Sequence, residues 1–196
     1  MSPPPLALLT DVTSAAALSV LSAARGLANP VFFVADRPAL DRLFEHFDAD
    51  SPWPGRLVGF FSDVIVPRRY LDAMALAPVN LHPAPPDYPG KRALEFALRD
   101  EVSSYGVTAH EMTLPVDSGP ILAVQRFPIT PGMTEAALRY LTWRAGFALM
   151  LGLLPTLARE EPLTVDPVEV WSERDCSEAA WQAVLAKDAR QETTPD

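Results

Sequence analysis

The stretch "VNLHPAPPDYPG", residues 79–90, places an asparagine and a histidine beside a stiff loop. Asn80 and His82 alternate with apolar residues, and four of the next seven residues are prolines, before Gly90. Side chains two residues apart on a β-strand point to the same side, so a strand over residues 79–82 would project Asn80 and His82 together. Because proline fixes φ, the loop that follows is predicted to form a preorganised wall beside them.

Upstream of this stretch, short apolar runs alternate with helical patterns. The apolar runs cover residues 6–11, 31–36 and 55–61, and residues 13–30 and 37–47 have the composition or spacing of helices. Continuously apolar strands are typical of a sheet that is covered on both faces. Strand–helix alternation at this spacing predicts parallel strands. The sequence therefore predicts an α/β protein with a mostly parallel central sheet and helices on both faces.

Downstream, the pattern predicts further helices and strands in one domain. We expect helices over residues 92–101, 134–160 and 177–188, and strands over 105–112, 121–129 and 168–171. The long helix should bend or end near Pro155. We expect one domain over residues 1–170, a C-terminal helix within 171–187 packed on it, and a disordered tail over 188–196.

Composition excludes several classes of function. A formal charge of −9 argues against a nucleic-acid partner, which needs a clustered basic face. No apolar run reaches the roughly eighteen residues of a membrane span, and the N-terminus lacks the basic region of a secretory signal. One cysteine and three histidines argue against a disulfide and a metal site, and fit a cytoplasmic location.

A second stretch, "GVTAHEMTLPVDSGPIL" over residues 106–122, supplies His110 and Asp117. The amide of Asn80 can donate a hydrogen bond to a carbonyl oxygen that gains charge, and His82 can shuttle a proton. Asp117 can orient the imidazole and raise its pKa. With no suitably placed Ser or Cys nucleophile, the set suits direct acyl transfer to an amine. Each histidine can equally be a structural residue on this pattern alone.

Taken in order, the two stretches resemble the catalytic core of the folate-dependent formyltransferases. The shared positions are Asn80, His82, Gly90, Gly106, Val107, Thr108, His110, Asp117 and Gly119. The similarity runs from about residue 58 to residue 128. It implies a Rossmann-like formyltransferase fold, with residues 1–170 as its catalytic domain.

The resemblance also implies roles for individual residues. Asn80, His82 and Asp117 would be the catalytic set that moves a formyl group from 10-formyltetrahydrofolate, the co-substrate, to an amine. The pterin would be held by Phe61, Ser62, Asp63, Val64, Ile65, Leu114, Pro115 and Val116. We expect His110 to have a supporting role in its strand.

The acceptor and the exact reaction stay open at this stage. The first apolar run is followed by "DVTSAAALS", which has no glycine for a phosphate loop, and this argues against glycinamide ribonucleotide as acceptor. A small amine, either an amino sugar nucleotide or a biosynthetic amine, is the preferred acceptor. A hydrolase that releases formate from the same folate, or a folate-binding module with little activity, are the alternatives. The apolar helix over residues 134–160 leaves room for a homodimer.

Overall fold

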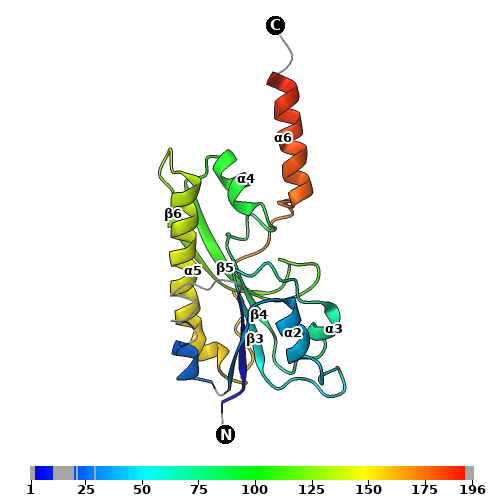
Figure 1. Cartoon of the computed structure of the whole chain (residues 1–196). Helices are drawn as coiled ribbons and strands as arrows, with labels where there is room; N and C mark the ends of the chain where they lie inside the picture. Colours follow the sequence, from blue (N-terminus) through cyan, green and yellow to red (C-terminus); the bar gives the residue numbers. More distant parts are fainter. Residues whose placement is uncertain (1–2, 11–19, 21, 29, 193–196) are drawn as a thin grey trace.

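The computed structural model describes residues 3–10, 20, 22–28 and 30–192, and it is built around one six-stranded sheet (Figure 1). The strand order is β2-β1-β3-β4-β5-β6. Strands β2, β1, β3 and β4 run parallel, whereas β5 is antiparallel to both β4 and β6. The predicted α/β fold with a mostly parallel sheet is confirmed. The bounds are β1 Leu6–Leu9, β2 Val31–Val34, β3 Arg56–Phe60, β4 Val79–His82, β5 Ser104–Glu111 and β6 Ile121–Pro128.

Helices cover both faces of the sheet, as predicted. Helix α5 lies along one face, and α2 and α3 lie on the other (Figure 1). No described helix combines the length and apolar character that crossing a bilayer requires. Of the helix predicted within 13–30, residues 20 and 22–25 are helical, and its start lies outside the described residues. The bounds are α2 Arg37–Leu43, α3 Arg68–Leu71, α4 Ala93–Arg99, α5 Glu135–Leu157 and α6 Glu178–Glu192.

The helix boundaries follow local chemistry. Asp36 accepts a hydrogen bond from the backbone N–H of Ala39 at 2.8 Å, which caps the first turn of α2. Thr134 caps α5 in the same way. The prediction that the long helix bends or ends near Pro155 is confirmed, because α5 stops at Leu157.

A buried cation joins the end of α5 to the sheet. Arg56 begins β3 and is 1% exposed, yet its guanidinium meets no carboxylate among its hydrogen-bond partners. It donates instead to four backbone carbonyl oxygens, which belong to Ala77, Leu157, Arg159 and Glu161. The carbonyl of Leu157, one of those that α5 leaves unpaired at its C-terminus, thus has a positive partner.

The strand predicted over residues 168–171 is wrong. These residues belong to an extended segment, 160–176, that we call the C-terminal strap. Its backbone makes isolated hydrogen bonds rather than a ladder. The N–H of Asp166 donates to the carbonyl of Ile121, and the N–H of Ser172 donates to that of Pro86. One hydrogen bond to the start of the edge strand β6 does not make the repeated ladder that defines a strand.

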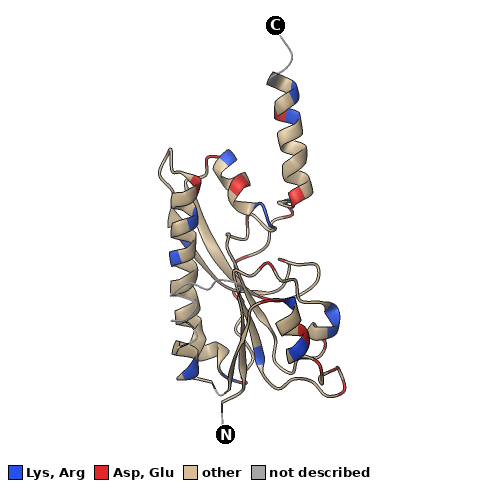
Figure 2. Cartoon of the chain, viewed as in Figure 1, with Lys and Arg blue, Asp and Glu red and all other residues tan. Residues whose placement is uncertain are grey.

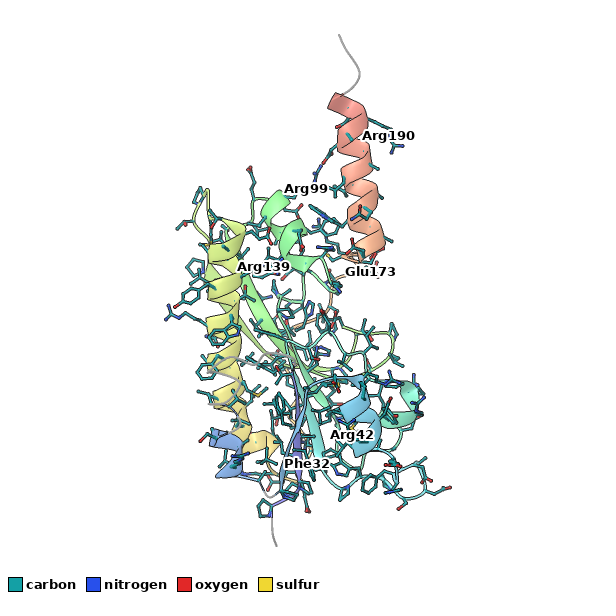
Figure 3. The ribbon with its side chains drawn as sticks, in the orientation of Figure 1. Phe32, Arg42, Arg99, Arg139, Glu173 and Arg190 are labelled. Carbon is teal, nitrogen blue, oxygen red and sulfur yellow. The ribbon has the colours of Figure 1, made fainter. Side chains whose placement is uncertain are left out.

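The C-terminal helix starts later and runs further than predicted. Helix α6 packs on α4, where the rings of Trp181 and Phe96 meet edge to face with centroids 5.1 Å apart. Residues 188–192 are helical, so the disordered tail predicted over 188–196 is wrong for them, and 193–196 lie outside the described residues. The guanidinium of Arg99 faces α6 and forms a two-pronged ion pair with Asp188, which holds the helix here (Figure 3).

Two glycines of α5 give a matched test of how Phe61 packs against this helix. A Cβ added at Gly146 would overlap the ring of Phe61, whereas a Cβ at Gly152 would meet nothing within 4 Å. Gly146→Ala should therefore lower the free energy of unfolding by about 1–3 kcal/mol through overpacking. Gly152→Ala should raise it by about 0.5–1 kcal/mol through helix propensity. Urea denaturation of both variants checks the signs. Equal effects would contradict the seating of Phe61 against α5.

Candidate functional site

A cavity of about 550 Å³ lies at the carboxyl end of β4. It is walled by the loops that follow β3 and β5, by the start of α4 and by the middle of α5. The position is the one at which open α/β sheets bind ligands, beyond the carboxyl ends of their strands. Asn80, His82, His110 and Asp117 all line it.

Asn80 is placed by the pairing of β4 with both of its neighbours. Its partner in β5 is His110, so their side chains lie on the same face, and Asn80 Nδ2 is 3.3 Å from His110 Nε2. On the other side it pairs with Gly59 of β3, where an added Cβ would come within 2.6 Å of Asn80 Oδ1. The missing side chain at Gly59 therefore makes room for the amide.

His82 is 5% exposed and is held through both ring nitrogens. Nε2 lies 2.9 Å from the carbonyl oxygen of Tyr88 in the proline-rich loop. A carbonyl only accepts, so Nε2 carries the proton and leaves Nδ1 facing Asp117 Oδ2 at 3.4 Å. Burial lowers the pKa of His82, against the opposing effect of the Asp117 charge.

The lowered pKa of His82 also predicts a direction for stability. An unfolded chain binds a proton at this histidine at higher pH than the folded chain does. The free energy of unfolding should therefore be unaffected by the titration of His82 above the unfolded pKa of about 6.5. It should decrease as the pH falls from about 6.5 toward the lower pKa of the folded state, because the unfolded chain then binds the proton more readily.

The Asp117 carboxylate connects the elements of the site. Oδ2 accepts a hydrogen bond from the backbone N–H of Gly90 at 3.0 Å, and Oδ1 lies 3.5 Å from His110 Nε2. Burial would raise the pKa of Asp117, but His82, His110 and the Gly90 N–H together hold it below the usual range. Asp117 itself has φ +51°, a left-handed conformation that aspartate tolerates better than most residues.

His110 lies between Asn80 and Asp117. Its Nδ1 lies 2.9 Å from the carbonyl oxygen of Glu111, which can only accept, so in the Nδ1–H tautomer Nε2 accepts from Asn80 at 3.3 Å. Asn80 then keeps its second amide hydrogen for a ligand. This geometry is compatible with the supporting role expected for His110, and that role stays a prediction.

The residues predicted to hold the pterin lie at the same cavity, with one exception. Phe61, Ser62, Asp63, Val64, Ile65, Leu114 and Val116 line it, whereas Pro115 does not. Ile65 and Val116 are 61% and 50% exposed, and they form an apolar rim on its two loops.

Sequence reasoning missed several residues of the site. Glu95 of α4 and three residues of α5, Arg139, Thr142 and Trp143, line the cavity. Trp171 of the strap packs against both imidazoles from outside it. These residues come from elements far apart in the sequence, so no local pattern indicates that they meet at the site. Among the described residues, no cluster of three His, Cys, Asp or Glu side chains is arranged to hold a metal ion.

The sequence profile described as "Formyl transferase" matches residues 56–150, which include Asn80, His82, His110 and Asp117. The chain belongs to the formyl transferase family. The resemblance found in the two sequence stretches is confirmed.

Curated relatives within this family include methionyl-tRNA formyltransferases. The one from Bradyrhizobium diazoefficiens is 31% identical over 144 residues, which are 71% of this chain and 44% of that protein. The one from Lactobacillus delbrueckii is 31% identical over 97 residues, or 49% of this chain and 31% of that protein. The chain thus spans less than half the length of the curated relatives it matches.

Solved structures of other proteins share the fold. A sugar N-formyltransferase from Shewanella has a TM-score of 0.67 at 15% identity, covering 92% of this chain and 79% of that one. Phosphoribosylglycinamide formyltransferase from Bacillus halodurans has a TM-score of 0.61 at 20% identity, covering 78% and 94%. HypX from Aquifex aeolicus in complex with tetrahydrofolic acid has a TM-score of 0.60 at 17% identity, covering 87% and 30%. At these identities the likeness concerns the fold alone.

Removing the charge of Asp117 should change the titration of His82. In Asp117→Asn the pKa of His82 should fall further, because the carboxylate is the neighbour that opposes the effect of burial. NMR titration of the imidazole, assigned with His82→Gln, measures this. Asp72→Asn, an exposed carboxylate on another element, is the control. A raised or unchanged His82 pKa in Asp117→Asn would contradict the pairing.

Proposed function

We propose that this chain is a 10-formyltetrahydrofolate-dependent N-formyltransferase that acts on a small-molecule amine. The observation that carries the proposal is the convergence of Asn80, His82 and Asp117 on one cavity, in a chain of the formyl transferase family. In this reaction the amine nitrogen bonds to the formyl carbon, the bond from that carbon to N10 of the folate breaks, and a proton passes from the amine to N10.

Asn80 and His82 would stabilise the oxyanion of the tetrahedral intermediate. The amide hydrogen that Asn80 does not give to His110 is free to point into the cavity. One such donor typically contributes 10²–10³ in rate. Because the pKa of His82 is lowered, the ring is neutral at pH 7 and can take up a proton as charge develops.

Asp117 would serve the proton transfer. Its lowered pKa keeps the carboxylate ionised, so it favours the imidazolium form of His82 when that forms during the reaction. With His82 Nδ1 3.4 Å from Oδ2, a proton taken up by the ring is directed toward the carboxylate. Proton transfer by positioned groups of this kind contributes on the order of 10²–10⁴ in rate.

The rim of the cavity fits the co-substrate. Ile65 and Val116 expose apolar side chains that a flat heterocycle would cover, and the two loops that carry them supply backbone hydrogen-bonding groups. We assign Phe61, Ser62, Asp63, Val64, Ile65, Leu114 and Val116 to the pterin, with Pro115 supporting the second loop.

Charge supports a small acceptor over a nucleic acid. In the view of Figure 2, basic positions are interspersed with acidic ones along the ribbon. The two cations that line the cavity, Lys91 and Arg139, already approach carboxylates, those of Asp63 for the first and of Glu95 and Glu135 for the second. Binding of tRNA needs many free phosphate contacts. An amino sugar nucleotide or a biosynthetic amine remains the proposed acceptor, and a cytoplasmic location and a homodimer remain predictions.

The catalytic assignment predicts large losses without unfolding. His82→Ala and Asp117→Asn should each lower turnover at least about a hundredfold. The matched controls are His46→Ala and Asp72→Asn, which remove the same groups from exposed positions outside the cavity. Formyl transfer is followed by absorbance, and circular dichroism verifies the fold. Near-normal turnover in both site variants would refute the assignment.

Dependence on an acceptor separates transferase from hydrolase. We expect turnover of 10-formyltetrahydrofolate only when a suitable amine is present, because the amine is the nucleophile. The panel should contain amino sugar nucleotides, hydroxylated ornithine and lysine, and free amino acids. Release of formate without any amine would instead establish the hydrolase, whereas folate binding without turnover would favour a binding module.

A further inference from the structure

The C-terminal strap, residues 160–176, crosses back to the catalytic side of the sheet after α5 ends. It is fastened at several points. The Ser172 hydroxyl donates to the carbonyl of Asp87 at 2.7 Å, and the carbonyl of Cys176 accepts from the N–H of Arg92 at 2.8 Å. Both points flank the proline-rich loop that carries the carbonyl partner of His82. All of the strap lies beyond the family match at residues 56–150.

Trp171 is the strap residue that reaches the catalytic side chains. Its ring meets His82 edge to face with centroids 5.8 Å apart, and His110 edge to face at 5.0 Å. Its Nε1 donates to the carbonyl oxygen of Gly119 at 2.8 Å. Gly119 lies two residues after Asp117, so one indole contacts both imidazoles and the loop that holds their carboxylate.

We propose that Trp171 is a positioning residue, which fixes the rings of His82 and His110 against Asp117 and keeps water from the side of the rings away from the cavity. It is not among the residues that line the cavity, so its contact with the site runs through the two imidazoles and the loop at Gly119. The expected effect of Trp171 on catalysis rests on the proposed function. Its effect on the positions of the two imidazoles does not depend on which reaction the site performs.

The physical reason is the rigidity of the arrangement. An indole has only two side-chain torsions, and the hydrogen bond to Gly119 fixes the direction of its ring. The rings it contacts cannot then turn without losing edge-to-face contact. A misplacement of about 1 Å at a reacting group can lower the rate about a hundredfold. Trp171 therefore acts through His82 and His110 and not on the acceptor.

Trp171 also contributes to the burial that keeps His82 neutral. The titratable groups that face His82 are His110 from β5 and Asp117 from the loop after it, whereas Trp171 adds an uncharged ring from the strap. Replacing the indole by a smaller side chain admits water, and hydration favours the charged imidazolium. The pKa of His82 should then rise.

The test uses the full chain and three substitutions. Trp171→Leu removes the ring, Trp171→Phe keeps an aromatic ring without the hydrogen bond, and Trp181→Phe changes a tryptophan that packs on α4 away from the cavity. We expect Trp171→Leu to lower kcat roughly 10–100-fold, with little change in KM for the folate. The acid limb of the pH–rate profile and the NMR titration of His82 should both move to higher pH. Trp171→Phe should recover part of kcat, and Trp181→Phe should match the wild type.

A folded Trp171→Leu protein with unchanged kcat and unchanged His82 titration would overturn the proposal. If that variant does not fold, Trp171→Phe decides by the same readouts, and wild-type values for both overturn it. If the wild type transfers no formyl group, the proposed function fails. The His82 titration still judges the positioning role separately, because it needs no substrate.

Discussion

The site depends on one buried negative charge. The carboxylate of Asp117 lies where water cannot solvate it well, and an ionised carboxylate in such a place must find compensating partners. The N–H of Gly90 donates to it, and His82 Nδ1 and His110 Nε2 face it at 3.4 and 3.5 Å, where a protonated ring would pair with it. These groups come from the loop before α4, β4 and β5. Three segments of chain are thereby fixed relative to one another by a single side chain. The relative positions of these three segments determine the shape of the cavity.

The antiparallel pairing of β5 with β4 makes this convergence geometrically feasible. It sets His110 opposite Asn80, so the loop after β5 leaves from the level of the amide and can bring Asp117 back toward His82. The long connection from β4 to β5, which contains α4, lets β5 enter beside His82 and end beside Val79. The two antiparallel strands thus serve the site as well as the sheet.

Local sequence signals predicted the parts that local physics determines. Continuous apolar runs indicated the parallel strands, and the two-residue period placed Asn80 and His82 on one side of β4. Distant partners were beyond such signals. Arg56 bonds to carbonyl groups about a hundred residues away, and Trp171 reaches a loop fifty-two residues earlier. The tail was misjudged for the same reason, since Asp188 is held by Arg99 of α4. The roles of the site residues were predicted from the resemblance to the family and not from local physics.

The guanidinium of Arg56 has a consequence for motion. Fraying of the last turn of α5 would remove the carbonyl oxygen of Leu157 from a guanidinium that is 1% exposed. The usual low-energy opening of a helix end is therefore suppressed, since it would strand a charge in the interior. The end of α5 and the start of β3 should exchange their amide hydrogens as one cooperative unit. The last turn of the long helix should thus be as well protected as the start of β3, although residues in the N-terminal half of that helix line the cavity.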